Sequence, residues 1–317
     1  MSKTRLFFVT DVHGSDACFR KFLNAAKFYK TNVLVLGGDI TGKTMVLIVD
    51  RNNGTYEYSY ADQDRQIDSR EALDSVIKEI RDSGAYPTVV SQKEYEELNT
   101  DPSRVKSLFK EMMIESVMRW MRLAEERLKG TGVQCYISPG NDDIFEIDSV
   151  LNSSSYVVNP EEKVTTVDGQ YEMITLGYAN RTPWNSPREL DEAILETKIE
   201  DMAKKLAKPE SSIFNIHVPP INTPLDQAPK VTVDLEPVVS AGHIVMTSAG
   251  SVATRNAIEK YQPLVGLHGH IHESKGVVKI GRTTCFNPGS EYGEGILRGV
   301  VLQLEDGKIR SYLLTAG

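Results

Sequence analysis

Five short motifs built from Asp, Asn and His each follow an apolar run that is typical of a buried strand. They are Asp-Val-His at 11–13, Gly-Gly-Asp at 37–39, Gly-Asn-Asp-Asp at 140–143, a lone His217, and Gly-His-Ile-His at 269–272. Any one of them alone is typical of a turn or of a structural histidine. Sites in open α/β sheets form beyond the carboxyl ends of strands, so all five together in such places predict one shared site.

The residue types predict that this site binds metal ions. Imidazole together with carboxylate and amide oxygens favours Mn, Fe, Zn or Co, and the motifs hold no thiolate that would demand a softer ion. Magnesium alone fits less well because it prefers oxygen ligands. Side-chain alternation along an extended chain is expected to turn Asp11 and His13 to one side, and His270 and His272 likewise.

Metal ions at this place would suit phosphate chemistry. Two divalent ions held by the carboxylates of Asp11 and Asp39, with neutral histidines, leave a local charge of about +2 that attracts a phosphate oxyanion. Water bound to such ions has a pKa of about 7 and can supply hydroxide.

The motifs resemble the signature of the metallophosphoesterase (calcineurin-like phosphoesterase) superfamily: D-x-H, G-D, G-N-[H/D/C], a later H, and G-H-x-H. The match spans positions 11 to 272, nearly the whole chain except an insert. The resemblance implies two divalent ions, with Mn2+ as the first choice and Fe, Zn, Co or Ni as alternatives. The ligands it implies are Asp11, His13 and His272 on one ion and Asn141, His217 and His270 on the other, with Asp39 bridging them.

The fold that the resemblance implies is α/β, a four-layer α/β/β/α sandwich with two mixed β-sheets. The sequence agrees in its first forty residues, which read as strand (Leu6–Val9), helix and strand (Val33–Leu36), with both strands buried on both faces as parallel strands are. After residue 160 short strands dominate, interrupted by helices near Pro187–Ala207 and Ala249–Tyr261. The chain therefore reads as a single domain, 1–317.

An insert of approximately 41–130 interrupts this domain. Asp39 and Asn141 are 102 positions apart, whereas a βαβ step takes about 30 residues or somewhat more. The insert reads as a hairpin followed by helices near Ile67–Arg81 and Ser103–Lys129. It could cap the active site or form the interface of a homo-oligomer.

Asp142 marks a departure from the superfamily pattern. Many members carry there a histidine that orients the phosphate and can protonate the leaving group. An aspartate could act as a general acid only if its pKa were raised, which a nearby cation opposes. Asp142 is therefore a candidate catalytic residue acting through water, or a turn residue; weak protonation would favour substrates with good leaving groups.

Three further residues are lesser candidates. His268 shares the alternation of the Gly-His-Ile-His motif and is favoured as a neighbour of the ligands rather than a ligand. Arg181, in a loop after a strand, could reach a phosphate, although an exposed loop charge is the simpler interpretation. His243 has no motif context and is expected to be structural or on the surface.

Composition limits the class of protein. The chain of 317 residues is 40% hydrophobic and 25% charged, near the globular average, which excludes disorder and coiled coil. Apolar runs are only strand-length, and the start of the chain leaves no room for a secretory segment. Three cysteines without a CxxC motif favour a reduced compartment, so a cytoplasmic protein without a membrane partner is expected.

The leading hypothesis is a dinuclear metal-dependent phosphoesterase that hydrolyses a small phosphodiester or phosphomonoester through metal-activated hydroxide. Phosphodiesters stand slightly ahead. The alternatives are a non-catalytic scaffold with the same fold, a protein phosphatase and a nuclease. The net charge of −8 and the lack of any basic run argue against a nucleic-acid partner.

Overall fold

The apolar runs that precede the motifs form the central strands of two mixed β-sheets. The structure is a computed structural model and describes residues 3–317. The first sheet has the order β21-β20-β1-β2-β7, in which β1, β2 and β7 are parallel and β20 and β21 are antiparallel. Its strands are β1 (Thr4–Val9), β2 (Val33–Gly37), β7 (Gln134–Ser138), β20 (Arg298–Glu305) and β21 (Lys308–Ala316).

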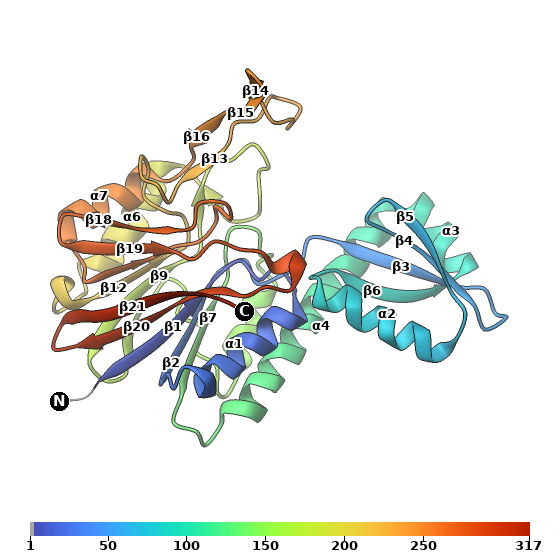
Figure 1. The fold of residues 1–317 in the computed structure, drawn as a ribbon, viewed down its shortest axis with the longest axis horizontal. Coiled ribbons are helices and arrows are strands. Elements are labelled where there is room, and N and C mark those ends of the chain that lie inside the picture. Colours follow the sequence, from blue (N-terminus) through green and yellow to red (C-terminus); the bar gives the residue numbers. More distant parts are fainter. Residues whose placement is uncertain (1–2) are drawn as a thin grey trace.

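The second sheet has the order β18-β19-β17-β12-β9-β8, with parallel pairing from β9 through β12 and β17 to β19. Its strands are β8 (Val164–Val167), β9 (Tyr171–Leu176), β12 (Ile213–Ile216), β17 (Val265–Leu267), β18 (Gly276–Ile280) and β19 (Thr283–Asn287). The two sheets lie face to face (Figure 1). Phe8 and Val35 of the first sheet share a buried cluster with Ile213 and Val265 of the second.

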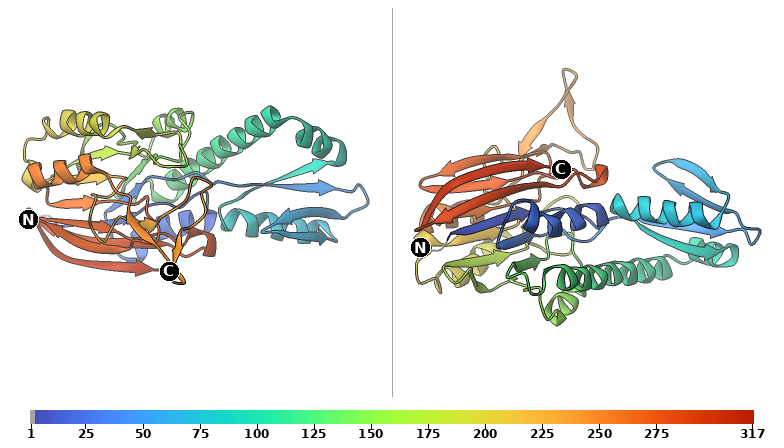
Figure 2. Two further views of the ribbon diagram at one scale, coloured as in Figure 1. Left: turned by 90° about the horizontal axis from the view of Figure 1, so that it is seen from above. Right: turned by 60° about the horizontal axis from the view of Figure 1, so that its bottom comes forward.

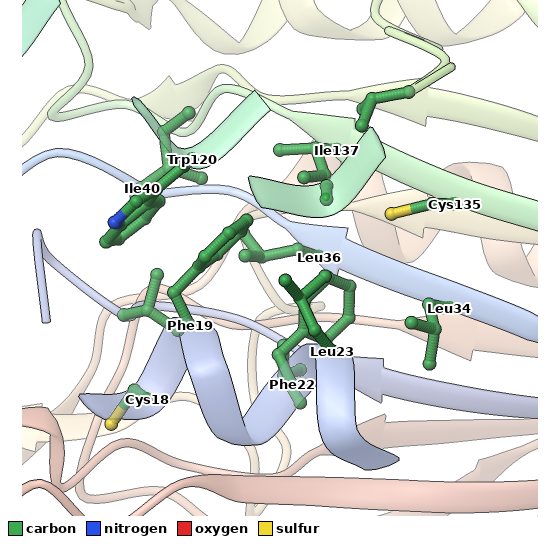
Figure 3. Close-up of a cluster of buried hydrophobic side chains, with 14 of the residues drawn as sticks. Cys18, Phe19, Phe22, Leu23, Leu34, Leu36, Ile40, Trp120, Cys135 and Ile137 are labelled. Carbon is green, nitrogen blue, oxygen red and sulfur yellow. The ribbon is translucent and has the colours of Figure 1, made fainter. Parts of the chain in front are cut away.

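Helices cover the outer face of each sheet, which confirms the expected four-layer α/β/β/α sandwich. The first sheet is covered by α1 (Asp16–Phe28), α4 (Pro102–Leu128) and α5 (Ile147–Ser153), and the second by α6 (Glu192–Ala203) and α7 (Val252–Tyr261). Figure 3 shows Phe22 and Leu23 of α1 lying over Leu34 and Leu36 of β2. Because the alternate β2 residues face the other sheet, the whole strand is apolar.

Residues 45–100 form a lobe of their own beside the sandwich (Figures 1 and 2). Its sheet has the order β5-β4-β3-β6, from β3 (Met45–Asp50), β4 (Tyr56–Tyr60), β5 (Gln63–Ile67) and β6 (Tyr86–Ser91), with helices α2 (Arg70–Asp82) and α3 (Gln92–Thr100). The expected hairpin is confirmed as β3 and β4. The expected helix from Ile67 begins only at Arg70, because Ser69 caps it and Ile67 belongs to β5.

Helix α4 joins this lobe to the sandwich. Near its start, Val105 and Leu108 pack on the lobe. Further along, Val117 and Trp120 lie in the core of the sandwich, and Trp120 stacks on Phe19 of α1 at 4.2 Å between ring centroids. The segment expected as an insert, 41–130, thus ends in a helix that is part of the sandwich core.

The remaining elements are short. An exposed arm projects from the sandwich (Figure 1) and holds β13 (Gln227–Pro229), β14 (Val239–Ser240), β15 (His243–Ile244) and β16 (Met246–Ser248). The others are β10 (Ala179–Asn180), β11 (Glu189–Leu190) and the 3-10 turns η1 (Pro209–Ser211) and η2 (Tyr292–Glu294). Among the helices within residues 3–317, none is long and apolar enough to cross a membrane.

Candidate metal centre

The first sheet delivers four of the predicted ligands from the ends of its parallel strands. Asp11 and His13 follow β1, Asp39 follows β2, and Asn141 follows β7. In the strand register Val9 lies opposite Leu36, and Gly37 opposite Ser138, so the three strands end at the same edge. The loops beyond them are therefore neighbours.

The second sheet delivers the other three. His217 follows β12, and the loop after β17 carries His270 and His272. The backbone nitrogen of His270 donates to Oδ2 of Asp11 at 3.1 Å, which joins the two sheets' loops directly. The structure thus brings together all seven side chains that the sequence places in one site.

Left-handed backbone, and not strand alternation, aims these side chains. Asp11, His13, Asp39 and His270 have φ angles of 54°, 37°, 51° and 68°. The expectation that an extended chain turns Asp11 and His13, or His270 and His272, to one side is therefore wrong in its mechanism. Non-glycine residues in this region cost about 1–3 kcal/mol each and gather at functional sites, where the surrounding structure holds them.

One group of potential ligands consists of Asp11, His13 and His272. Oδ1 of Asp11 lies 3.3 Å from Nε2 of His272 and 3.9 Å from Nε2 of His13. The two imidazole Nε2 atoms face each other at 3.1 Å. Three ligand atoms thus surround one point, in the combination that the sequence placed together.

A second group consists of Asp39, His217 and His270. Oδ2 of Asp39 lies 3.4 Å from Nε2 of His217 and 3.6 Å from Nε2 of His13, so this carboxylate stands between the two groups. Oδ1 of Asn141 lies 2.7 Å from Nδ1 of His270. A third group in the described part of the chain joins His13, Asp39 and Asp142.

Burial and neighbouring charges shift the pKa values of the site's side chains. The side chains of Asp11, Asp39, His13 and His217 are at most 2% exposed. Burial raises the pKa of Asp39 to about 6. Burial acts to lower the pKa of His217, but the charges of Asp39 and Asp11 raise it to about 10. The carboxylates of Asp39 and Asp11 thus favour a positive charge on His217, and they would favour a bound cation for the same reason.

Backbone carbonyls orient the buried histidines. Nδ1 of His217 lies 2.9 Å from the carbonyl oxygen of Gly37, and Nδ1 of His13 lies 3.3 Å from that of Thr41. Each ring is thereby turned so that Nε2 faces the site. Nε2 of His217 is buried and makes no hydrogen bond. Ligating histidines in metalloproteins are held in this way by a partner on the other ring nitrogen.

The amide of Asn141 is oriented by Asp142 and by Ser186, which the sequence did not mark. Its Nδ2 donates to Oγ of Ser186 at 2.7 Å and to Oδ1 of Asp142 at 2.8 Å, which leaves Oδ1 directed at His270. Ser186 in turn donates to the carboxylate of the buried Glu189 at 2.8 Å. The amide oxygen is therefore the atom presented to the site.

Asp143 ties the loops of Asp39 and Asn141 together. Its buried carboxylate accepts from the backbone nitrogens of Ile40, Thr41 and Gly140 and from Oγ1 of Thr41. Asp143 ends the Gly-Asn-Asp-Asp motif, but the sequence predicted no role for it.

The segment after β19 holds the remaining loops. Oγ of Ser290 donates to the carbonyl oxygen of Asp11 at 2.6 Å, and Nδ2 of Asn287 donates to that of Ile271 at 2.9 Å. The ring of Tyr292 lies 4.7 Å from that of His13. Nothing in the sequence marked Tyr292.

Asp142 forms an ion pair with Lys43, a residue absent from the expectations. Nζ of Lys43 lies 2.5 Å from Oδ2 of Asp142. Burial acts to raise the pKa of Asp142, but the ammonium of Lys43 lowers it below its usual range. This direction disfavours Asp142 as a proton donor, and any other catalytic role of Asp142 stays a prediction.

The lesser candidates belong to none of the ligand groups in the described part of the chain. His268 is buried, with Nδ1 2.7 Å from the carbonyl oxygen of Ile216, the residue before His217. Arg181 is 57% exposed and pairs with Asp191. His243 is exposed on the arm.

Comparison with known proteins bears on the fold. No protein-family profile matches the chain. An uncharacterized protein of Methanocaldococcus jannaschii is 33% identical over 153 residues, which cover 47% of this chain and 61% of that protein. The match thus spans less than two thirds of the relative's length.

Two solved structures resemble the whole chain. One has a TM-score of 0.59 at 19% identity, covering 99% of both chains. The protein TT1561 of Thermus thermophilus has a TM-score of 0.55 at 14% identity, covering 100% of this chain and 99% of that one. At these identities the likeness concerns the fold alone.

Fold and site together define a class. The chain is an α/β sandwich of two mixed sheets whose facing loops gather potential metal ligands at one end. The α/β fold expected from the motifs is confirmed, and the two solved structures share it along the whole chain.

Proposed function

We propose that this protein is a phosphoesterase that depends on two divalent metal ions and hydrolyses a small phosphodiester or phosphomonoester. The observation that carries the proposal is the position of Asp39. Its Oδ2 lies 3.4 Å from Nε2 of His217 and 3.6 Å from Nε2 of His13, between two groups of ligand atoms. A carboxylate so placed can contact two ions at once.

The residues present fit a pair of divalent ions. Imidazole nitrogens, carboxylates and one amide oxygen suit Mn2+ first, and Fe, Zn, Co or Ni as alternatives. Nε2 of His217 is buried without a hydrogen-bond partner, and the facing Nε2 atoms of His13 and His272 are only 3.1 Å apart. The unpaired nitrogen of His217 is costly to bury unless something binds it.

In this proposal Asp11, His13 and His272 would hold one ion, Asn141, His217 and His270 would hold the other, and Asp39 would serve both. The ions would supply Lewis acidity and lower the pKa of a bound water. The chain's own part is to exclude bulk water by burial and to fix the donor atoms. The backbone carbonyls of Gly37 and Thr41 fix the rings of His217 and His13, and Ser186 fixes the amide of Asn141.

The substrate preference follows from Asp142. Because Lys43 lowers the pKa of Asp142, this residue is a poor proton donor. Substrates with good leaving groups need less protonation, and we place phosphodiesters slightly ahead of monoesters on this ground. The formal charge of −8 favours a small phosphoester over a nucleic acid as the partner.

The test is hydrolysis by protein stripped with a chelator and reloaded with Mn, Fe, Co, Ni or Zn. Bis-nitrophenyl phosphate and nitrophenyl phosphate serve as substrates. We expect turnover with at least one metal, and a loss of at least about 100-fold in Asp39→Asn, the upper range for disturbing even the partners of metal ligands. Asp201→Asn, the same change at an exposed position on α6, is the control.

Elemental analysis of each sample accompanies the assay. Absence of turnover with every metal would contradict the proposal, as would full activity in Asp39→Asn. A protein that cannot be loaded with metal at all would favour the alternative of a non-catalytic scaffold.

A further inference from the structure

We propose that Lys43 binds a non-bridging phosphoryl oxygen of the substrate, and that its ion pair with Asp142 holds the ammonium ready at the rim of the site. This inference rests on the proposed function and adds to it a residue that selects for the charge of the phosphate. Lys43 stands at the root of the lobe formed by residues 45–100, outside the motifs that resemble the superfamily.

The ammonium lies next to the ligand groups. Its Nζ is 2.5 Å from Oδ2 of Asp142. A carboxylate oxygen of Asp142 is in turn within 4.8 Å of the ligand atoms of His13 and Asp39. A phosphoryl group held by ions in the two ligand groups would therefore come within reach of Lys43.

The pair lies on the solvent side of the site. The side chains of His13 and Asp39 are at most 2% exposed, whereas those of Asp142 and Lys43 are 22% and 48% exposed. The pair and His272, whose side chain is 27% exposed, therefore line the side from which a substrate can approach. Exposed ion pairs contribute little to stability, about 0–1 kcal/mol, so the gain from placing the pair here lies in binding.

The backbone around Lys43 is fixed by the site itself. Thr41 is held by Asp143 through both its backbone nitrogen and its hydroxyl. The backbone nitrogen of Gly42 donates to the hydroxyl of Tyr86 in the lobe at 2.7 Å. Lys43 thus leaves a rigid loop that also carries Asp39, and its reach toward the phosphate is preorganised.

The pair also resolves a conflict of charge. An isolated carboxylate at position 142 would repel an incoming phosphate, and Lys43 neutralises it while keeping further N–H donors free for the substrate. A dianionic monoester gains more from one positive charge than a monoanionic diester does. Lys43 should therefore matter more for monoesters.

The experiment compares Lys43→Met, Lys43→Arg and the control Lys93→Met, which makes the same change at a lysine of α3 whose side chain is 86% exposed. KM and kcat are measured with nitrophenyl phosphate and bis-nitrophenyl phosphate. Binding of inorganic phosphate to the Mn-loaded protein is measured by calorimetry, and metal content by elemental analysis.

We expect Lys43→Met to raise KM for the monoester and weaken phosphate binding by about 10-fold or more, as a charge-assisted hydrogen bond implies. The change for the diester should be smaller, Lys43→Arg should recover most of the phosphate affinity, and metal content should not change. Adding Asp142→Asn to Lys43→Met should restore part of the phosphate affinity by removing the unpaired carboxylate.

The proposal would be overturned if Lys43→Met lost equal activity on both esters or lost metal. It would also be overturned if Lys43→Met bound phosphate as tightly as the control Lys93→Met does. No recovery in the double variant would overturn the role given to the ion pair. If the wild-type protein hydrolyses neither ester, the proposed function fails, while the phosphate calorimetry still decides on Lys43.

Discussion

Replacing Asp143 by asparagine tests a buried residue that supports the candidate site without changing any of the candidate ligands. The carboxylate accepts hydrogen bonds of 2.9 and 2.8 Å from the backbone nitrogens of Ile40 and Thr41, 2.5 Å from Oγ1 of Thr41, and 2.7 Å from the backbone nitrogen of Gly140. Three of these bonds fix the loop that carries Asp39, and the fourth fixes the loop after β7. The side chain itself is fully buried.

The magnitude follows from counting donors. Asparagine keeps one acceptor oxygen, and its NH2 group faces the other two donors. The Thr41 hydroxyl can rotate and accept, but at least one backbone N–H is left unpaired, at about 1–3 kcal/mol, and charge-assisted bonds of about 1.5–3 kcal/mol are weakened. Burial raises the pKa of Asp143, so the neutral amide avoids some desolvation. We expect a net loss of about 2–4 kcal/mol from the free energy of unfolding.

The assay is urea unfolding in the presence of a chelator, with metal affinity measured separately by calorimetry. Asp201→Asn, an exposed aspartate on α6, controls for the change of charge. We expect metal affinity to fall together with stability, because the same carboxylate positions both loops. A free energy of unfolding within about 0.5 kcal/mol of the control, the usual range of surface substitutions, would refute the reasoning.

Three further predictions concern other supports. Gly84→Ala should lower the melting temperature more than Gly54→Ala. Both glycines have positive φ, but only at Gly84 would a Cβ meet a backbone oxygen, at 2.4 Å. Equal melting temperatures of the two variants would contradict this prediction. Ser186→Ala should weaken one of two metal-binding steps in calorimetry by about 10-fold, because the hydroxyl orients Asn141, and unchanged steps would argue otherwise. Burial raises the pKa of Glu161 from 4.5 to about 8, so the folded state retains a proton and metal-free stability should fall as pH rises through that window. Measured by urea unfolding across this pH window, the free energy of unfolding should change less with pH in Glu161→Gln than in the wild-type protein. The same pH dependence in both proteins would contradict the assignment.

The place of the candidate ligands was predictable because the end of a buried parallel strand can be recognised in the sequence. A strand buried on both faces is a continuous apolar run, and the first polar residue beyond it lies at the edge of the sheet. Asp11, Asp39 and Asn141 follow three such runs in one sheet, and His217 and His270 follow two in the other. The strand order was not needed, since all five runs end at the same side of the sandwich.

The conformation of the loops was not predictable from alternation. Positive φ at Asp11, His13 and Asp39 is imposed by neighbouring loops and not by local preference. The backbone nitrogen of His13 donates to the carbonyl oxygen of Asp39, and that of Asp11 to Gly38. These bonds connect segments more than twenty positions apart, which a pattern of period two does not describe.

Supports such as Lys43, Ser186 and Tyr292 carried no sequence signal for a similar reason. Each contributes one side chain from a segment whose own pattern is ordinary. Ser186 meets Asn141 across 45 positions, and Lys43 meets Asp142 from the root of the lobe. Only the folded chain shows that they surround the ligands.

The sequence pattern did not predict β21 and the strands of the arm, for a different reason. Periodicity reports the burial of one face, and β21 and the arm strands bury little on either face. Along β21 the residues from Ser311 to Leu314 are all exposed, although three of them are apolar or aromatic. Pairing with β20, and not burial, makes this segment a strand.

The root of the lobe shows how closely it is built into the site. A Cβ at Gly14 would lie 2.7 Å from the carbonyl oxygen of Gly84, and one at Gly42 would lie 2.1 Å from the same oxygen, so three backbone segments touch without side chains between them. Ser15, which caps α1, donates to the carbonyl oxygen of Asp82 at the end of α2 at 2.6 Å. A hinge at this point would have to break these contacts and would shift the loop of His13. Any partner or substrate that displaces the lobe must therefore also move residues of the candidate metal centre.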